Sequence, residues 1–451
     1  MSNYLIGPDA AISSIKAGKN TFITGPGGSG KSHIIHQIKE TMGEDSLFLA
    51  PTGIAALNID GMNAHKAMGL AMGISTHHDF TKVRSDKQAK LLSSKAIKRI
   101  VLDEISMFRA DKLMEMDYKL RHFRKNSQPF GGLQVIAFGD GFQISPVLKR
   151  EETAEFYSLF KSEIPFDSET WDLLGFTCVL LDKVWRQEDA EFAAVLNKLR
   201  MGIDISQGVQ YMNSRCGNKG TLEDAVTLTT TNKLAEEINK RMFDSLPGRK
   251  TTHRASLTGD FKERPVSDVL EIKEGLKVMI TANDTETPAR YVNGTVGIVR
   301  RCAASYVLVD IDGDLVEVMP KEWKNINYEI VKEPKPVLDE QGKPVMDENG
   351  KPKMRMTEVK AEKVLGKFSQ FPIKMGYAIT IHKSQGLTLG RVNIDLGFGA
   401  FAPGQAYVAL SRAKSTEGLR LVKPLRNKDI LVDKRVVDFY LRTFPILKPG
   451  S

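Results

Sequence analysis

Residues 21–38 read TFITGPGGSGKSHIIHQI and decide the fold class, because they join an apolar strand to a helix through a glycine-rich loop. The strand is residues 21–24, and residues 33–38 carry apolar side chains at a helical spacing. The loop between them, residues 25–32, fits the pattern G-x-x-x-x-G-K-[ST] at every fixed position. A strand, a loop and a helix in this order predict an α/β domain that binds a nucleotide phosphate.

The residue types of this loop suit a phosphate ligand. Glycines allow backbone N–H groups to curl around a phosphate, and the N-terminus of the next helix adds partial positive charge. Lys31 should reach the β- and γ-phosphates, and the Ser32 hydroxyl should ligate Mg²⁺. We therefore expect ATP and Mg²⁺ as cofactors. The residues expected to bind ATP are Gly25, Pro26, Gly27, Gly28, Ser29, Gly30, Lys31 and Ser32.

Two further apolar strands end in polar side chains. Residues 100–102 are followed by Asp103 and Glu104, and the carboxyl ends of parallel strands lie beside such a loop. Asp103 suits Mg²⁺, through a water molecule, and Glu104 suits the attacking water as base or orienting group. An isolated Asp–Glu pair would be a solvated acidic turn, but its place after a phosphate loop favours the catalytic interpretation. The strand 133–138 leads to Gln143, which either hydrogen-bonds the γ-phosphate or the attacking water or is an ordinary loop amide.

Composition and charge point to a globular chain with a polyanionic partner. Its 451 residues are enough for about three domains, and a net charge of +9 with a pI near 9.1 favours nucleic acid. The N-terminal stretch MSNYLIGPDA lacks the regions of a secretion signal, and no run approaches the roughly 20 apolar residues of a membrane span. The three cysteines fit no metal spacing and no disulfide framework. We expect an intracellular, cytoplasmic protein (at the nucleoid, or in a host cytoplasm) without a membrane partner.

Nine longer stretches follow one another along the chain: APTGIAALNI (50–59), LDEISM (102–107), DKLMEMDYKLRHFR (111–124), GDGFQISPV (139–147), VWRQ (184–187), LTTTNKLAEEIN (228–239), YVNGTVG (291–297), FPIKMGYAITIHKSQGLT (371–388) and GQAYVALSR (404–412). Together, in this order, they resemble the Pif family of helicases. That family belongs to the 5′→3′ branch of superfamily one, with the RecD-like and Dda-like enzymes. The sequence departs from the family at Asp9, near the expected place of a glutamine that reads adenine, because Asp cannot donate a hydrogen bond as Gln does. Gly141 and Ser145 stand where an aromatic residue and a proline are more usual.

The resemblance also implies roles for single residues. Arg186 and Arg412 would reach across a cleft to the γ-phosphate as arginine fingers, whereas the usual fate of an arginine is a surface salt bridge. Two of the expected DNA contacts, His65 and His382, could instead be structural histidines. The implied catalytic residues are Lys31, Glu104, Gln143, Arg186 and Arg412, and the implied single-stranded DNA contacts are Thr52, His65, Thr380, His382, Lys383 and Ser384.

The expected architecture is α/β, with two RecA-like P-loop NTPase domains and a small β-barrel inserted in the second. Short β-type runs and the turn signal Asp312-Gly313 indicate the insertion. Near-repeats rich in Pro, Gly and charge indicate an exposed hairpin within it. The expected ranges are 1–165 for the first motor domain (with a wedge-type insertion at about 64–96), 175–264 and 367–451 for the second, 265–366 for the barrel, and about 335–358 for the hairpin.

These features predict an ATP-dependent 5′→3′ DNA helicase and single-strand translocase. Its expected partners are single-stranded DNA and tailed or forked duplexes, with replication or recombination proteins as further candidates, and we expect a monomer. The processes expected from the resemblance are DNA replication, repair, recombination and telomere maintenance. One alternative is a translocase that does not unwind duplex. A second is a P-loop ATPase whose target is not nucleic acid. Strand displacement from a tailed duplex would exclude the first alternative. Strong stimulation of ATP hydrolysis by single-stranded DNA would exclude the second.

Overall fold

The phosphate loop belongs to the larger of two parallel sheets in the chain. The computed structural model describes residues 4–146, 148–183, 189–217, 220–223, 225–262, 264–286, 288–339, 341 and 343–447. The first sheet has seven strands in the order β1-β7-β2-β6-β5-β3-β4, and every neighbouring pair is parallel. Its strands are β1 Tyr4–Ile6, β2 Thr21–Thr24, β3 Ser46–Ala50, β4 Met62–Asn63, β5 Arg99–Leu102, β6 Gln134–Gly139 and β7 Thr177–Leu180.

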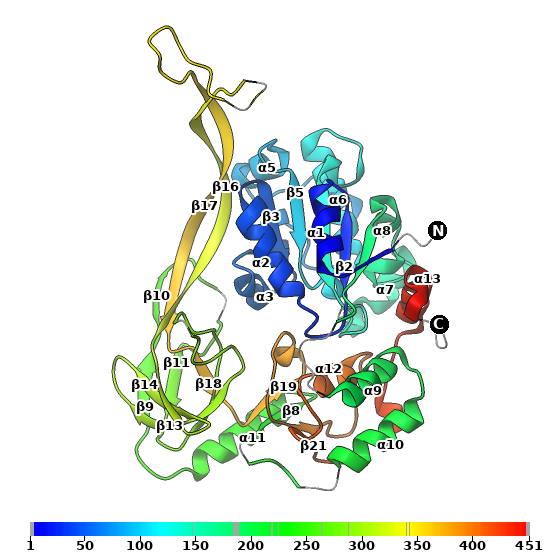
Figure 1. Cartoon of the computed structure of the whole chain (residues 1–451), viewed down its shortest axis with the longest axis vertical. Helices are drawn as coiled ribbons and strands as arrows, with labels where there is room; N and C mark the ends of the chain where they lie inside the picture. The colour runs from blue at the N-terminus through cyan, green and yellow to red at the C-terminus, as the bar shows by residue number, and fades with distance from the viewer. Residues whose placement is uncertain are drawn as a thin grey trace.

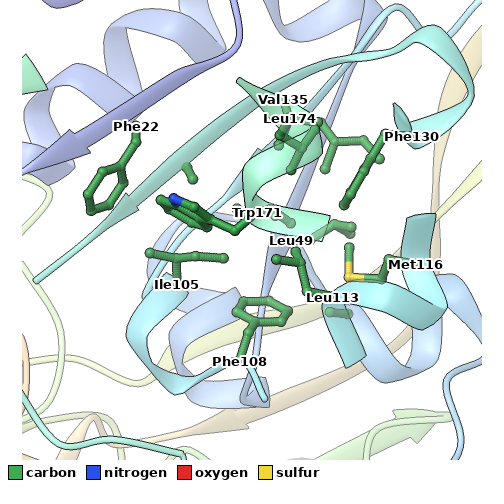
Figure 2. Packing of buried hydrophobic residues seen from close by; sticks show 14 of the residues in the cluster. Phe22, Leu49, Ile105, Phe108, Leu113, Met116, Phe130, Val135, Trp171 and Leu174 are labelled. Atoms are coloured by element: carbon green, nitrogen blue, oxygen red, sulfur yellow. The ribbon is translucent and has the colours of Figure 1, made fainter. Parts of the chain in front are cut away.

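Two hydrophobic cores cover the two faces of this sheet, because successive side chains of a strand point to opposite faces. Phe22 of β2 packs in one core, and its neighbour Ile23 packs in the other. Figure 2 shows the first core, where Phe22 lies near Trp171. Burial of both faces explains the nearly continuous apolar strands. The helices of this half of the chain are α1 Pro8–Lys16, α2 Lys31–Met42, α3 Gly53–Asn58, α4 Ala64–Met68, α5 Asp86–Ser93, α6 Ala110–Arg124, α7 Thr153–Leu159 and α8 Glu169–Leu174.

The expected boundary between the motor domains, 165 to 175, needs correction. Strand β7, which we assigned to the second domain, lies between β1 and β2 of the first sheet. Helix α13 (Lys434–Thr443), at the end of the chain, also packs on the first domain, where Phe439 and Tyr440 join its core. Figure 1 shows α13 beside α7 and α8. The first domain therefore includes segments from both sides of the second.

A smaller parallel sheet forms the second motor domain. Its strand order is β19-β8-β20-β21, and all its pairs are parallel. Its own core includes Leu196, Leu228, Ile379 and Val408. The two parallel sheets confirm the α/β class expected from the sequence. The elements are β8 Val226–Thr229, β19 Ala378–Thr380, β20 Val392–Asp395, β21 Leu419–Leu421, α9 Ala190–Met201, α10 Ile205–Cys216, α11 Asn232–Ser245 and α12 Gln405–Leu410.

Antiparallel strands separate β8 from β19, over a wider range than the expected 265–366. A five-stranded sheet (β15-β14-β13-β12-β18) and a two-stranded sheet (β11-β9) share one core. Among the described residues the pairing leaves both sheets open at their edges, so a closed barrel is not confirmed. These strands are β9 Thr251–Arg254, β11 Val269–Ile272, β12 Lys277–Ile280, β13 Val296–Cys302, β14 Val307–Ile311, β15 Asp314–Val318 and β18 Ile373–Met375.

A long hairpin arm extends from this insertion along the first motor domain (Figure 1). Strands β16 (Lys321–Pro336) and β17 (Met354–Gln370) pair from end to end, with β10 (Ser256–Gly259) along the base. The expected excursion at 335–358 is therefore only the distal part of a longer hairpin. Tyr328 of the arm is buried in the core of the first domain. Within the described residues every helix is too short or too polar to span a membrane.

Candidate nucleotide site and nucleic-acid groove

The phosphate loop has the predicted strand–loop–helix setting. Strand β2 ends at Thr24, and α2 begins at Lys31. Gly30 precedes the helix with φ +94°, a left-handed conformation that favours glycine. Lys31 Nζ donates to Gly25 O at 2.8 Å and Pro26 O at 3.0 Å, so the ammonium group lies over the loop. The ATP-binding residues predicted from the sequence are thus contiguous at the carboxyl edge of the first sheet.

Asp103 and Glu104 follow β5 at the same edge of the sheet. Burial raises the pKa of Asp103 to about 7, the charge of Glu104 adds to the rise, and Lys31 opposes it. Burial also raises the pKa of Glu104, while Lys31 and Arg412 oppose that rise. Among the described residues, Glu104 Oε2 is buried without a hydrogen-bond partner. The carboxylates and the loop lysine therefore share one electrostatic environment, as predicted.

Glu104 has an unusual backbone conformation, with φ 50° and ψ 48°. A non-glycine residue in the left-handed region is uncommon, and strain of this kind often occurs at functional sites. The residue begins a short 3-10 helix, η3 (Ile105–Met107), directly after Asp103.

Gln143 lies where the two motor domains meet. It follows β6 and is buried, with its backbone N–H donating to Asp140 O at 3.0 Å. A Cβ atom added to Gly404, at the start of α12, would come within 2.7 Å of Gln143 O. The second domain therefore approaches the backbone of this segment closely, and the glycine makes that approach possible.

The two predicted arginine fingers have different outcomes. Arg412 follows α12 and is 1% exposed, and the charges of Glu104 and Asp140 act on it. It donates to Val408 O at 2.9 Å, Leu387 O at 3.1 Å and Ser411 Oγ at 2.9 Å. Its charge acts on Glu104 of the first domain. Arg186 lies outside the described residues.

Helices of the second domain lie directly against the phosphate loop. Gly27 N donates to Tyr407 Oη of α12 at 3.4 Å. Residues of α9, among them Ala193 and Asn197, face the same part of the loop across a cavity of about 10 Å³. The space is about one water molecule in size. The described conformation therefore has the two motor domains in contact over the loop.

The sequence patterns did not identify four buried residues near this contact as site residues. Asp140 and Tyr407 lie inside motifs quoted for the resemblance, and that position could have singled them out. Arg200 and Tyr440 lie outside those motifs, and no sequence signal separates them from the other arginines and tyrosines. All four are buried close to the phosphate loop.

The predicted nucleic-acid contacts fall on both motor domains. On the first, Thr52 caps α3 by accepting from Ala55 N at 3.2 Å. His65 of α4 lines a cavity of about 530 Å³ between the first domain and the arm, and burial lowers its pKa, with Lys112 lowering it further. A depressed pKa means that this imidazole is neutral at physiological pH, so it would contact DNA as a neutral group.

On the second domain, Thr380 and Lys383 line a groove of about 760 Å³. Lys374 lines it as well, and burial together with the charge of Lys383 lowers the pKa of Lys374 to about 8. Burial also lowers the pKa of His382. Ser384 is 0% exposed and donates to Ile381 O at 2.7 Å, so its hydroxyl binds its own backbone rather than lining the groove. The other lysines of the groove are Lys240, Lys250 and Lys273.

Comparisons with known proteins agree with this geometry. A PIF1-like helicase model matches residues 9–207, and a model described as a helicase matches residues 293–443. The chain is 31% identical to an ATP-dependent DNA helicase Pif1 from a Psychrobacter species, over 91% of this chain and 67% of that protein. The chain belongs to the Pif1 helicase family. It is also 29% identical to the Bdellovibrio bacteriovorus Pif1 helicase, over 96% of this chain and 90% of the relative.

Solved members of this family share the whole fold. Unliganded Pif1 from a Bacteroides species is 28% identical, with a TM-score of 0.82, over 97% of this chain and 96% of that chain. The same protein bound to single-stranded DNA is 30% identical, with a TM-score of 0.64, over 95% and 94%. The chain spans 61% to 66% of the eukaryotic relatives, which include human and yeast proteins.

Proposed function

We propose that this protein is an ATP-dependent DNA helicase that moves 5′→3′ along single-stranded DNA. One observation carries the proposal: Arg412 Nη1 donates to Leu387 O at 3.1 Å and to Ser384 O at 3.3 Å. That segment follows directly on Thr380 and Lys383, which line the basic groove. Arg412, whose charge acts on Glu104, therefore also holds the segment at the groove. The direction of movement rests on the family resemblance.

The residues at the loop suit ATP hydrolysis. Lys31 would bind the β- and γ-phosphates, and Glu104 would orient or activate the attacking water. Charge grows on the γ-phosphate oxygens as the bond breaks, and Arg412 would stabilise that charge from the second domain. Removal of the γ-phosphate would leave Arg412 without its anionic partner. Because the same guanidinium holds the 384–387 backbone, a movement of Arg412 would also move the segment next to Thr380 and Lys383, which line the groove.

Mg²⁺ fits the oxygen atoms of this edge. Ser32 and Asp103 would hold it, since hydroxyl and carboxylate oxygens are the ligands that Mg²⁺ prefers. Glu104 Oε2 is buried and has no hydrogen-bond partner among the described residues, so this oxygen is available to accept from a water molecule at the site. Bound Mg²⁺ would neutralise phosphate charge beside Lys31.

The groove of the second domain suits a DNA backbone. Lys374, Lys383 and the Thr380 hydroxyl are groups that bind phosphate oxygens without reading base sequence. Glu236, Asp244 and Glu271 also line the groove, where Lys240 pairs with Asp244 and Lys250 pairs with Glu271. One solved structure is Bacteroides Pif1 bound to single-stranded DNA, and another concerns DNA unwinding at forked duplex DNA by two coordinating Pif1 helicases. We propose the same substrates here, with a monomer as the acting unit because one chain supplies both sides of the ATP site.

Steady-state ATP hydrolysis, measured with and without single-stranded DNA and RNA, tests the proposal. We expect single-stranded DNA to raise turnover at least about tenfold, because the groove and Arg412 share one segment. Turnover that is unchanged by either nucleic acid would contradict the proposal and favour an ATPase with another target. Stimulation by RNA alone would reassign the substrate.

A further inference from the structure

A buried ion pair joins the two motor domains beside the nucleotide site. Arg200 Nη2 donates to Asp140 Oδ1 at 2.7 Å, and Arg200 Nε donates to the same oxygen at 3.2 Å. Arg200 is 3% exposed and Asp140 is 0% exposed. Asp140 follows β6 of the first sheet, whereas Arg200 lies on α9, whose Leu196 and Leu199 pack in the core of the second domain. The pair therefore spans the domain interface.

Aromatic rings from the first domain's core enclose the guanidinium. Arg200 Cζ lies 4.5 Å from the centre of the Phe142 ring and 5.7 Å from that of Tyr440. The Tyr440 hydroxyl is hydrogen-bonded to Thr24 Oγ1 at 2.6 Å and accepts from Gly141 N at 2.9 Å. Thr24 is the last residue of β2, directly before the phosphate loop. One tyrosine thus connects Arg200 to the strand that carries the loop.

The carboxylate of this pair also affects the catalytic residues. Burial is the main cause of the raised pKa of Glu104, and the negative charge of Asp140 adds to it. Asp140 Oδ2 is buried and has no hydrogen-bond partner among the described residues. Loss of Arg200 would leave Asp140 uncompensated close to Glu104, and an unpaired buried charge is strongly unfavourable.

The domains are closely packed around the pair. The cavity lined by Phe142, Leu199, Gly404 and their neighbours has a volume of only about 10 Å³. Separation of the domains here would expose these packed surfaces and leave the buried charges unpaired, which is strongly unfavourable. A rotation that keeps the pair intact would avoid that cost.

Rotation of the domains about the Asp140–Arg200 pair would move residues that line the DNA groove. Helix α9 packs in the same core as Ile379 and Ile381, which flank Thr380. A change in the angle of α9 therefore moves the strand and turn that carry Thr380 and Lys383. Thr24 and the phosphate loop stay on the other side of the pivot, tied to it through Tyr440.

We propose that Asp140 and Arg200 form the fixed pivot of the two motor domains. In this proposal Arg200 is a positioning residue that transmits closure over the nucleotide to the DNA groove. The inference rests on the proposed function, since it presumes a movement driven by ATP along DNA. It adds a specific residue pair through which the two sites would be coupled.

Two substitutions at Arg200 test the pivot. Arg200→Gln removes the charge, and Arg200→Lys keeps the charge but loses the planar fork that donates twice and stacks on the rings. Arg215→Gln is the matched control, because Arg215 pairs with Glu191 and lies over Tyr211 on the exposed surface of the same domain. Each variant is assayed for the dissociation constant of single-stranded DNA, with and without a non-hydrolysable ATP analogue, for turnover and for thermal unfolding.

We expect the nucleotide to change DNA affinity in the wild type and in Arg215→Gln. In Arg200→Gln this change should fall to less than twofold, and DNA-stimulated turnover should fall at least about tenfold relative to wild type. DNA affinity without nucleotide should stay within about threefold, since Arg200 does not line the groove. Arg200→Lys should give a nucleotide effect and a DNA-stimulated turnover below those of wild type but above those of Arg200→Gln. If Arg200→Gln does not fold, an Arg200→Lys variant with both values as in wild type would overturn the inference.

Two outcomes would overturn the inference. An Arg200 variant with a lowered melting temperature but a wild-type nucleotide effect on DNA affinity would show a purely structural ion pair. Loss of DNA affinity without nucleotide would place Arg200 in the binding surface itself. If the wild type shows neither DNA-stimulated hydrolysis nor a nucleotide effect, the proposed function fails first, and the Arg215→Gln control will show the same failure.

Discussion

Replacement of Asp103 by Asn should stabilise the nucleotide-free protein at neutral and alkaline pH. Burial is the main cause that raises the pKa of Asp103 from 3.8 to about 7, with a further rise from Glu104 and opposition from Lys31. A carboxyl group with a raised pKa binds its proton more tightly in the folded state. Folding stability from this group is therefore lost as pH rises from about 4 to about 7. Asparagine carries no charge and escapes this loss.

The size of the effect follows from the shift. A rise of one pH unit in pKa corresponds to about 1.36 kcal/mol, so the whole shift corresponds to about 4 kcal/mol. About two pH units of this shift lie above pH 5, and their contribution to stability is lost by pH 8. The stability gap between Asp103→Asn and wild type should therefore widen by about 3 kcal/mol over that interval. For a motor domain of about 200 residues, in which 1 kcal/mol shifts the melting temperature by about 2–4 °C, the gap corresponds to roughly 6–12 °C.

Thermal unfolding without nucleotide or Mg²⁺, at several pH values from 5 to 8, measures this gap. Asp438→Asn is the matched control, because Asp438 lies on the exposed side of α13. The control should follow the wild type at every pH. A gap between Asp103→Asn and wild type that stays constant from pH 5 to pH 8 would refute the argument from burial.

Three further predictions concern catalysis and binding. Glu104→Gln should bind ATP and single-stranded DNA but hydrolyse at least about a hundredfold more slowly; single-turnover hydrolysis near the wild-type rate would remove Glu104 from its role. Arg412→Ala should lower turnover roughly a thousandfold, with poor rescue by lysine, which lacks the fork, and the same is expected of Arg186; wild-type rates in steady-state assays would contradict both assignments. The logarithm of the DNA association constant should fall linearly with the logarithm of salt concentration, by about 0.7 per phosphate contacted, and Lys383→Ala should make this slope shallower by about that amount in anisotropy titrations. A slope unchanged by Lys383→Ala would remove Lys383 from the DNA contacts.

Local patterns predicted the elements that bind phosphate. The loop from Gly25 to Ser32 has fixed spacing because its backbone must wrap around one phosphate chain, and that geometry appears in the sequence itself. Asp103 and Glu104 were predictable for the same reason, since a buried strand delivers them to one edge of the sheet. These parts depend on contacts between residues close in sequence.

Contacts between distant residues were not predictable in the same way. Strand β7 is a short apolar run that could pair in either motor sheet, and the choice depends on its parallel partners β1 and β2. Tyr440 reaches Thr24 across a separation of 416 residues. Arg200 meets Asp140 only because the domain interface buries both. The hairpin was placed too short, because its pairing extends far below the turn residues that marked it.

Strand displacement from tailed duplexes, under single-turnover conditions with ATP, tests the central claim most directly. The account predicts that the wild type displaces a strand from a duplex with a 5′ single-stranded tail, and that Glu104→Gln binds this substrate without displacing the strand. A duplex with only a 3′ tail should stay intact. Displacement from the 3′ tail alone would contradict the proposed direction. Hydrolysis stimulated by DNA without displacement from either substrate would contradict duplex unwinding and leave a translocase on single strands.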